Sequence, residues 1–294
     1  MNISLRHIVA MGACTFASAV TIFPHTRGLE LYRQFKAKYR LDQSEEPVKE
    51  KFKIMFEEVM NDLKLNQEQR EKLRIFNVCG YDVFHAGTLS RKRGGVVGIP
   101  MNFDYESVDT INKNDIILND KPIPWHQQEA KDFLESLVLS ENAKKFALAR
   151  EILKVREHSI EMDTISCLGH FLLLFFIYDT FHKRMVLSER KVARFMIASA
   201  VCVGGIASFF GLYNSNQYTN DFKVDTKLSK LGPEYIEGGK EFYEKLLKRN
   251  IALRTLLGKN GEKLFTKNGN EIYFLWSKRL SIHDRRNFLE SGTY

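Results

Sequence analysis

The nearest approach to a catalytic pattern lies in the tract LSENAKKFALAREILKVREH, residues 139–158. A zinc site of the HExxH kind places two histidine ligands on one face of a helix, with a glutamate between them as general base. Here Arg150 and Lys154 stand at the two ligand positions, and Glu151 stands at the position of the base. A guanidinium or ammonium group cannot replace imidazole on Zn²⁺, so the sequence predicts no zinc catalysis at this tract.

Other reactive groups are sparse. The sequence has no GxSxG motif, and the glycine-rich tract Gly94–Pro100 lacks the Gly-Lys-Ser/Thr ending of a phosphate loop. Cys79 is the single cysteine outside the apolar runs, which hold Cys14, Cys167 and Cys202. A thiolate metal site needs at least two soft ligands close together. We therefore predict that the chain is not an enzyme and has no catalytic residues, bound metal or cofactor.

The elements around these residues can be predicted from local patterns. A helix over residues 48–63 follows Ser44 and Pro47, and Asn66 is expected to cap another helix that runs to about Phe76. We expect strands in the tracts GYDVFHAG (80–87), GGVVGIP (94–100) and DIILNDKPIPW (115–125), the last with a tight turn at residues 119–120. The glycines of residues 94–100 are expected to permit close backbone packing.

Two further helices and a hairpin follow the same reasoning. Ser140 is expected to cap a long helix, Pro233 to begin another, and Gly258 to end it. The run LFTKNGNEIYFLW predicts a β-hairpin around Asn268-Gly269. An isolated hairpin is barely stable, so it is expected to join the sheet and unite residues 24–163 and 214–294 in one composite mixed α/β soluble domain.

Three apolar runs interrupt the polar sequence. Residues 164–181 and 195–213 are long enough to predict two transmembrane helices that form a hairpin; the alternative is a buried hairpin in a soluble core. Residues 8–23 are short for a span, and three interpretations compete: a cleaved secretory signal, a buried helix and an uncleaved signal anchor. We favour the anchor.

The loop at residues 182–194 has a charge of +4, because it holds five basic residues and Glu189. Short basic loops stay on the side from which a membrane is entered. This loop is therefore predicted to lie on that side, with residues 24–163 and 214–294 together on the opposite side. The topology determinants are Lys183, Arg184, Arg190, Lys191 and Arg194.

Small residues recur at helical spacing along the third run, and a small-xxx-small face lets another helix approach closely. His170 lies near the middle of the second run, residues 164–181, where an ionisable residue is a candidate for a functional role. The simpler interpretation is that His170 forms a hydrogen bond to the neighbouring helix. The helix-contact candidates are Ala200, Gly204, Ser208, Gly211 and His170.

The predicted fold class is an α+β membrane protein with a transmembrane helical hairpin, an N-terminal anchor helix and the composite domain. The predicted divisions are residues 1–23 (anchor), 24–163 (soluble), 164–213 (hairpin) and 214–294 (soluble). Net charge is +8, but no large segment has the basic excess of a nucleic-acid binder, so nucleic acid is not expected as a partner.

Three blocks resemble the transmembrane protein 177 family: GGVVGIP (94–100), SENAKKFALAREI (140–152) and GGKEFYEKLLKRNIALRTLLGKNGEKLFTKNGN (238–270). The resemblance implies a non-enzymatic accessory factor in the early maturation of cytochrome c oxidase subunit 2. The implied partners are the newly made subunit, its assembly chaperone and the lipid bilayer. The implied location is the mitochondrial inner membrane, with the soluble segments in the intermembrane space. The alternative is a membrane-anchored enzyme with a peptidase-like scaffold and an unrecognised site.

Overall fold

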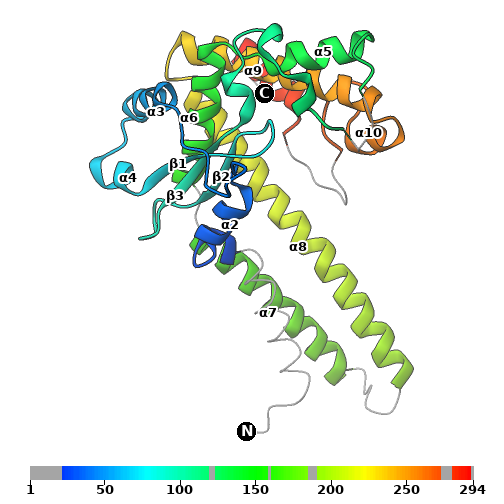
Figure 1. The fold of residues 1–294 in the computed structure, drawn as a ribbon. Coiled ribbons are helices and arrows are strands. Elements are labelled where there is room, and N and C mark those ends of the chain that lie inside the picture. The colour runs from blue at the N-terminus through cyan, green and yellow to red at the C-terminus, as the bar shows by residue number, and fades with distance from the viewer. Residues whose placement is uncertain (1–21, 119–122, 158–159, 185–190, 273–279, 293–294) are drawn as a thin grey trace.

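The computed structural model describes residues 22–118, 123–157, 160–184, 191–272 and 280–292. Helices dominate, and a small sheet lies at one side of the globular part (Figure 1). The helices before the projecting arm are η1 (Phe23–His25), α2 (Leu29–Lys36), α3 (Glu50–Asp62), α4 (Gln67–Glu71), η2 (Met101–Asp104), η3 (Val108–Thr110), η4 (Lys113–Asp115), α5 (Gln128–Leu137) and α6 (Glu141–Glu157). The remaining helices are α7 (Ile160–Arg184), α8 (Lys191–Leu228), α9 (Pro233–Leu256), α10 (Lys259–Leu264) and α11 (Ile282–Ser291).

The sheet has three strands in the order β1-β3-β2: β1 (Leu73–Asn77), β3 (Gly95–Ile99) and β2 (Phe84–Gly87). β3 runs parallel to β1 and antiparallel to β2. Every residue of β3 is buried, as expected for a central strand that is covered on both faces. A Cβ built on Gly95 would lie 2.1 Å from Cγ1 of Val155, which confirms that a glycine here permits close packing against α6.

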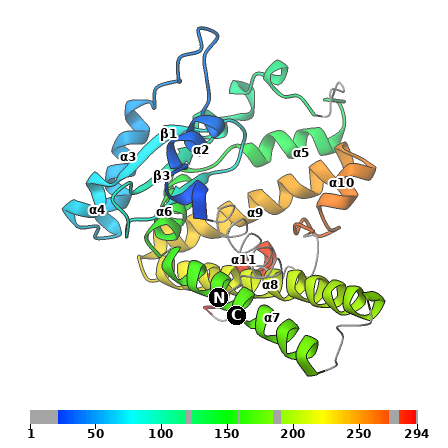
Figure 2. The ribbon, with the colours of Figure 1, turned by 90° about the horizontal axis from the view of Figure 1, so that it is seen from below.

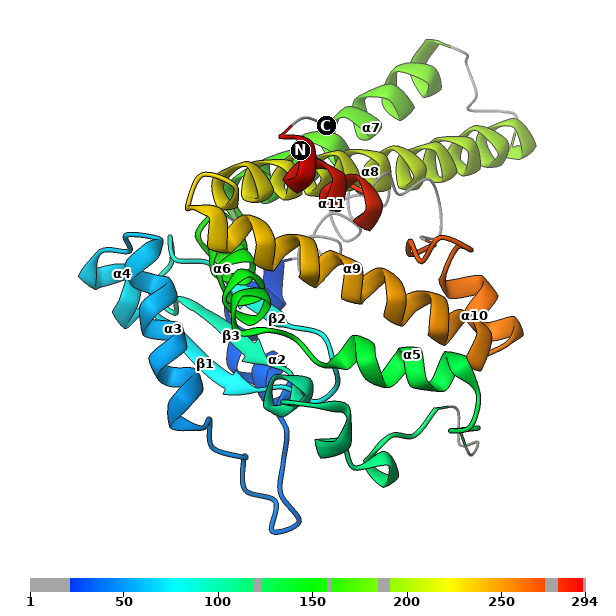
Figure 3. The ribbon, with the colours of Figure 1, turned by 90° about the horizontal axis from the view of Figure 1, so that it is seen from above.

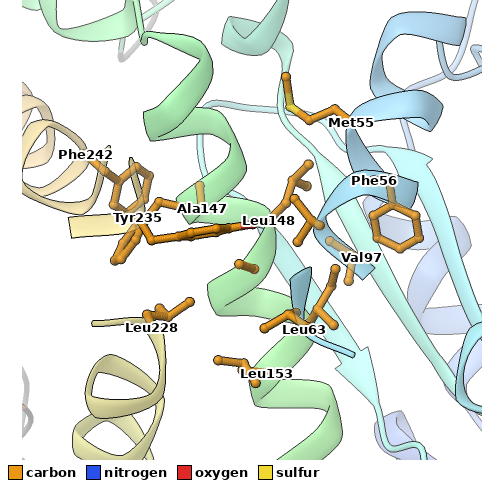
Figure 4. Packing of buried hydrophobic residues seen from close by; sticks show 14 of the residues in the cluster. Met55, Phe56, Leu63, Val97, Ala147, Leu148, Leu153, Leu228, Tyr235 and Phe242 are labelled. Carbon is orange, nitrogen blue, oxygen red and sulfur yellow. The ribbon is translucent and has the colours of Figure 1, made fainter. Parts of the chain in front are cut away.

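Helix α6 runs through the centre of the core (Figure 4). Leu148 contributes to a cluster that includes Met55 of α3 and Val97 of β3 on one side and Phe242 of α9 on the other. The helix begins where the sequence predicts, because Oγ of Ser140 accepts a hydrogen bond from the backbone N–H of Ala143 at 3.2 Å.

Helix α9 closes the core from the C-terminal side of the chain. It lies alongside α5 and crosses α6, as Figure 3 shows. Pro233 occupies the first turn, and Gly258 follows the helix with a φ of 57°, so both predicted ends are close to the observed ones. The backbone N–H of Ser140 donates to Glu241 of α9 at 2.8 Å, which ties the start of α6 to α9.

Helices α7 and α8 form a long antiparallel pair that projects from the globular part as an arm (Figures 1 and 2). The C-terminal end of α8 returns to the core, where Val224 and Leu228 are fully buried. Many apolar side chains of the arm are exposed: Ile165, Leu168, Leu172, Leu173, Phe176, Ile177, Val192, Phe195, Met196, Val203 and Leu212.

The predicted fold class is wrong in one respect. Within the part of the chain that the structure describes, no helix is both long enough and apolar enough to cross a membrane, so the transmembrane hairpin of residues 164–213 is not supported. The prediction rested on the length of these two runs and on their lack of charge. Helix α7 carries His170 and Asp179, and α8 turns polar from Asn214 onward. The fold is mostly helical, with the small sheet described above.

Several local predictions also need correction. Helix α3 begins after Lys49, and no side chain caps it, so Ser44 and Pro47 precede the helix without starting it. Asn66 does cap α4 through a capping box with Gln69, but the helix ends at Glu71 and the chain turns into β1. The described part of residues 115–125 forms no strand beyond an isolated bridge residue at Leu118, and Ile116 is buried in a cluster beneath α5.

The C-terminal hairpin is described only in part. Phe265 and Glu271 form an antiparallel bridge across a turn in which Gly269 has a φ of 81°, and residues 265–272 add no strand to the sheet. The predicted anchor within residues 1–23, the turn at 119–120 and the end of the hairpin lie largely or wholly outside the described residues.

Candidate functional site

A carboxylate buried beside the sheet is the centre of the candidate site. Glu151 projects from α6, and only 3% of its side chain is exposed. Its Oε2 contacts Nδ1 of His85 on β2, and its Oε1 lies 2.9 Å from Nη1 of Arg150 and 3.7 Å from Nζ of Lys154. The two cations that replace the histidines of the zinc motif therefore surround the glutamate as ion-pair partners.

This environment keeps Glu151 ionised. Burial alone would raise the pKa of its carboxyl group, but Lys154, Arg150 and His85 together hold that pKa far below its usual range. Burial also lowers the pKa of the Lys154 ammonium, and the neighbouring Arg150 adds to that effect. A carboxylate held so firmly in ion pairs is a weak general base.

A second buried cluster joins α8, α9 and α11. Oδ2 of Asp225 accepts from Nε of Arg285 at 2.7 Å, and its Oδ1 accepts from Nη2 of Arg285 at 2.7 Å and from the hydroxyl of Tyr243 at 3.0 Å. The Asp225 side chain is fully buried, so these three bonds replace its lost hydration. Burial raises the pKa of the Tyr243 hydroxyl well above its ordinary value.

Asp221 connects the two clusters. It lies 3.5 Å from Nζ of Lys154 and 3.2 Å from Nη1 of Arg285. Burial tends to raise the pKa of its carboxyl group, but these two cations lower it to about 2. Basic and acidic side chains therefore alternate from His85 through Glu151, Lys154 and Asp221 to Arg285. We call this series of ion pairs the charge ladder.

A cavity of about 450 Å³ lies along this ladder, and both Arg150 and Arg249 line it. Arg249 donates to the carbonyl of Tyr81 and to Asp82, the latter at 2.7 Å. The Nε atoms of Arg150 and Arg249 are buried and have no hydrogen-bond partner among the described residues. Because these two atoms are enclosed by protein, they do not by themselves mark a ligand site, and the ion-paired acids give little support to acid–base catalysis.

The helix-contact candidates lie in the arm, away from this cavity. The structure brings two of them together: Oγ of Ser208 lies 3.1 Å from Nε2 of His170, so the pair links α8 to α7. Ser208 also donates to the carbonyl of Gly204 within α8. A Cβ built on Gly204 or Gly211 meets no heavy atom of the described structure within 4 Å, and Ala200 is exposed.

The topology determinants lie around the far end of the arm. Lys183 and Arg184 end α7, Lys191 and Arg194 lie in the first turn of α8, and Arg190 falls outside the described residues.

Sequence reasoning singled out Arg150, Glu151 and Lys154 but not their partners. His85 is 66 residues from Glu151, and Arg285 is 60 residues from Asp225. No local spacing signals pairs so far apart. The one usable signal was the unusual density of charge in a helix that was expected to pack in the core.

Two comparisons with known proteins, one with family models and one with individual proteins, give the same family. A family model described as "Transmembrane protein 177" matches residues 16–275. Proteins named "Transmembrane protein 177" are 30% identical over 230 residues in Homo sapiens and 27% identical over 252 residues in Danio rerio. The alignments cover 77% and 80% of this chain and 72% and 77% of those proteins, respectively. No solved structure gives a significant match.

Proposed function

Because the chain belongs to the transmembrane protein 177 family, we propose that it is a non-enzymatic accessory factor in the early maturation of cytochrome c oxidase subunit 2. It stabilises the newly made subunit and its assembly chaperone in the mitochondrial inner membrane. The family name supports a membrane protein in general terms. The particular role rests on the blocks of family resemblance in the sequence.

One structural observation carries the proposal: the arm exposes apolar side chains that the globular core leaves uncovered. Leu173 and Phe176 of α7 are 57% and 65% exposed, and Val203 of α8 is 68% exposed. A concentration of apolar surface of this kind marks a site of contact with a protein or a lipid phase. A hydrophobic client protein within a membrane provides such a contact.

The test is a pull-down from mildly solubilised mitochondria after pulse-labelling of mitochondrial translation. We expect newly made subunit 2 to be enriched over other new translation products. Leu173→Ser with Phe176→Ser should reduce that enrichment. The matched control, Leu41→Ser with Ile117→Ser, replaces apolar residues that are 107% and 71% exposed outside the arm, and it should leave the enrichment unchanged. Recovery of the protein without subunit 2 would contradict the proposal.

An enzyme is the second candidate, and His85 is the observation that favours it. Its ring is oriented by the buried Glu151, and both residues line the cavity. A histidine held in this way by a carboxylate is a common catalytic pair. We expect purified protein to show no hydrolysis of peptide or ester substrates. Hydrolysis that disappears in His85→Ala would establish the enzyme instead.

A further inference from the structure

The turn between β2 and β3 is strongly basic. Its tip, Ser90-Arg91-Lys92-Arg93, is exposed, and residues 87–95 contain no acid. The turn has a defined shape, because the backbone N–H of Thr88 donates to the carbonyl of Gly94 at 3.1 Å. Gly94 has a φ of 67°, and a Cβ there would lie 1.9 Å from the carbonyl oxygen of Lys72. The cations are therefore presented by a fixed turn.

Two backbone contacts place this turn at the root of the arm. Nη1 of Arg93 donates to the carbonyl of Arg27 at 2.8 Å, which brings the turn against the segment that follows the N-terminal apolar run. The backbone N–H of Leu89 donates to the carbonyl of Val155 at 3.4 Å, near the end of α6, and α7 begins shortly afterwards. Figure 1 shows the sheet and α2 next to the start of α7.

The exposed basic side chains at this root form few ion pairs with acidic side chains. Arg27 and Lys92 form no ion pair with any described residue, and Arg93 binds a carbonyl instead of a carboxylate. A nearby acid, Glu157 at the end of α6, is already paired with Arg156 and Lys227. The root therefore presents net positive charge beside the exposed apolar surface of the arm.

We propose that Arg27, Lys92 and Arg93, here called the basic root, bind the phosphate groups of anionic phospholipids at a membrane surface. Basic residues next to an apolar segment fit this partner, because the apolar side chains meet the hydrocarbon while the cations meet the headgroups. A headgroup contact of this kind requires no helix to cross the bilayer. The inference rests on the membrane location included in the proposed function, and it names the lipid chemistry that the root recognises.

The test measures flotation of the full-length protein, diluted from detergent, with two kinds of vesicle. One contains phosphatidylcholine alone, and the other also contains phosphatidylglycerol. The root variant carries Arg27→Glu, Lys92→Glu and Arg93→Glu. Each basic residue near an anionic surface contributes roughly fivefold to the partition coefficient, so loss of three predicts a decrease on the order of 100-fold for phosphatidylglycerol vesicles. Partition onto phosphatidylcholine vesicles should not change.

The matched control carries Lys131→Glu, Lys263→Glu and Lys267→Glu, which change the net charge by the same amount. These exposed lysines lie on or next to α5 and α10, across the globular part from the β2–β3 turn (Figure 1). The control should partition within about threefold of the unmodified chain, as expected for charges away from the surface. Equal losses in the two variants, or no loss in the root variant, would overturn the inference.

Two further measurements separate other outcomes. A root variant that binds vesicles normally but loses affinity for single-stranded RNA would assign the root to nucleic acid and refute the lipid assignment. Thermal unfolding of the variants shows whether the fold is intact.

The subunit 2 pull-down is scored separately from vesicle binding. Root-dependent vesicle binding without enrichment of subunit 2 would refute the proposed function and leave the lipid contact standing.

Discussion

The crossing of α9 over α6 can be tested at Gly238. A Cβ built there would lie 2.3 Å from the carbonyl oxygen of Asn142 and 3.0 Å from the backbone nitrogen of Ala143. Ordinary contact begins at 3.4 Å, so Gly238→Ala requires the helices to separate by about 1 Å. Overpacking of this kind costs about 1–3 kcal/mol, and the better helix propensity of alanine offsets about 1 kcal/mol. The free energy of unfolding should therefore not rise, and should fall by up to about 2 kcal/mol.

The matched control is Gly211→Ala in α8, where no described heavy atom lies within 4 Å of the new Cβ. Here only the propensity gain remains, so the free energy of unfolding should rise by about 0.5–1 kcal/mol. Differential scanning fluorimetry of purified protein checks both variants, since 1 kcal/mol shifts the melting temperature by about 2–4 °C in a large chain. If Gly238→Ala raised the melting temperature as Gly211→Ala does, the close crossing of α6 and α9 would be wrong.

The two other predictions concern the buried charges. Asp225→Ala should lower the free energy of unfolding by about 3 kcal/mol in a denaturant titration, because buried Arg285 loses its bidentate partner and keeps only Asp221, at 3.2 Å. The double variant with Arg285→Met should recover much of that loss, and failure to recover would refute the ion-pair explanation. The carboxyl pKa of Asp221 falls from 3.8 to about 2 on folding, so its contribution of about 2 kcal/mol is present above pH 4 and lost as the pH falls toward 2. Asp221→Asn should therefore make stability less dependent on pH between 4 and 2, and an unchanged profile would show that this carboxylate is not the group responsible.

The parts of the fold that sequence predicted well are those set by local chemistry. Ser140, Pro233 and Gly258 mark helix ends because each satisfies or accommodates the backbone at a terminus. The strand over Gly95–Ile99 was also predicted, since a short run of small and β-branched residues suits a fully covered strand.

The errors arose where distant packing decides the structure. Residues 115–118 have the apolar pattern of a strand, but Ile116 instead joins a cluster with Phe133 and Leu137 of α5. The charge ladder is a similar case. Glu151 could be singled out because it lies in a recognisable helical motif, whereas His85 and Asp221 become its neighbours only through the tertiary fold.

The position of α6 also constrains the order in which the chain can fold. One side of this helix is covered by α3 and the sheet, which precede it, and the other by α9, which follows the whole arm. During synthesis, Phe146 and its neighbours must wait for Phe242 and Tyr243 to leave the ribosome before their rings can meet. Such delayed contacts slow folding and leave apolar surface open in the partly made chain. A chain that stops within the arm would keep its core permanently open on that side.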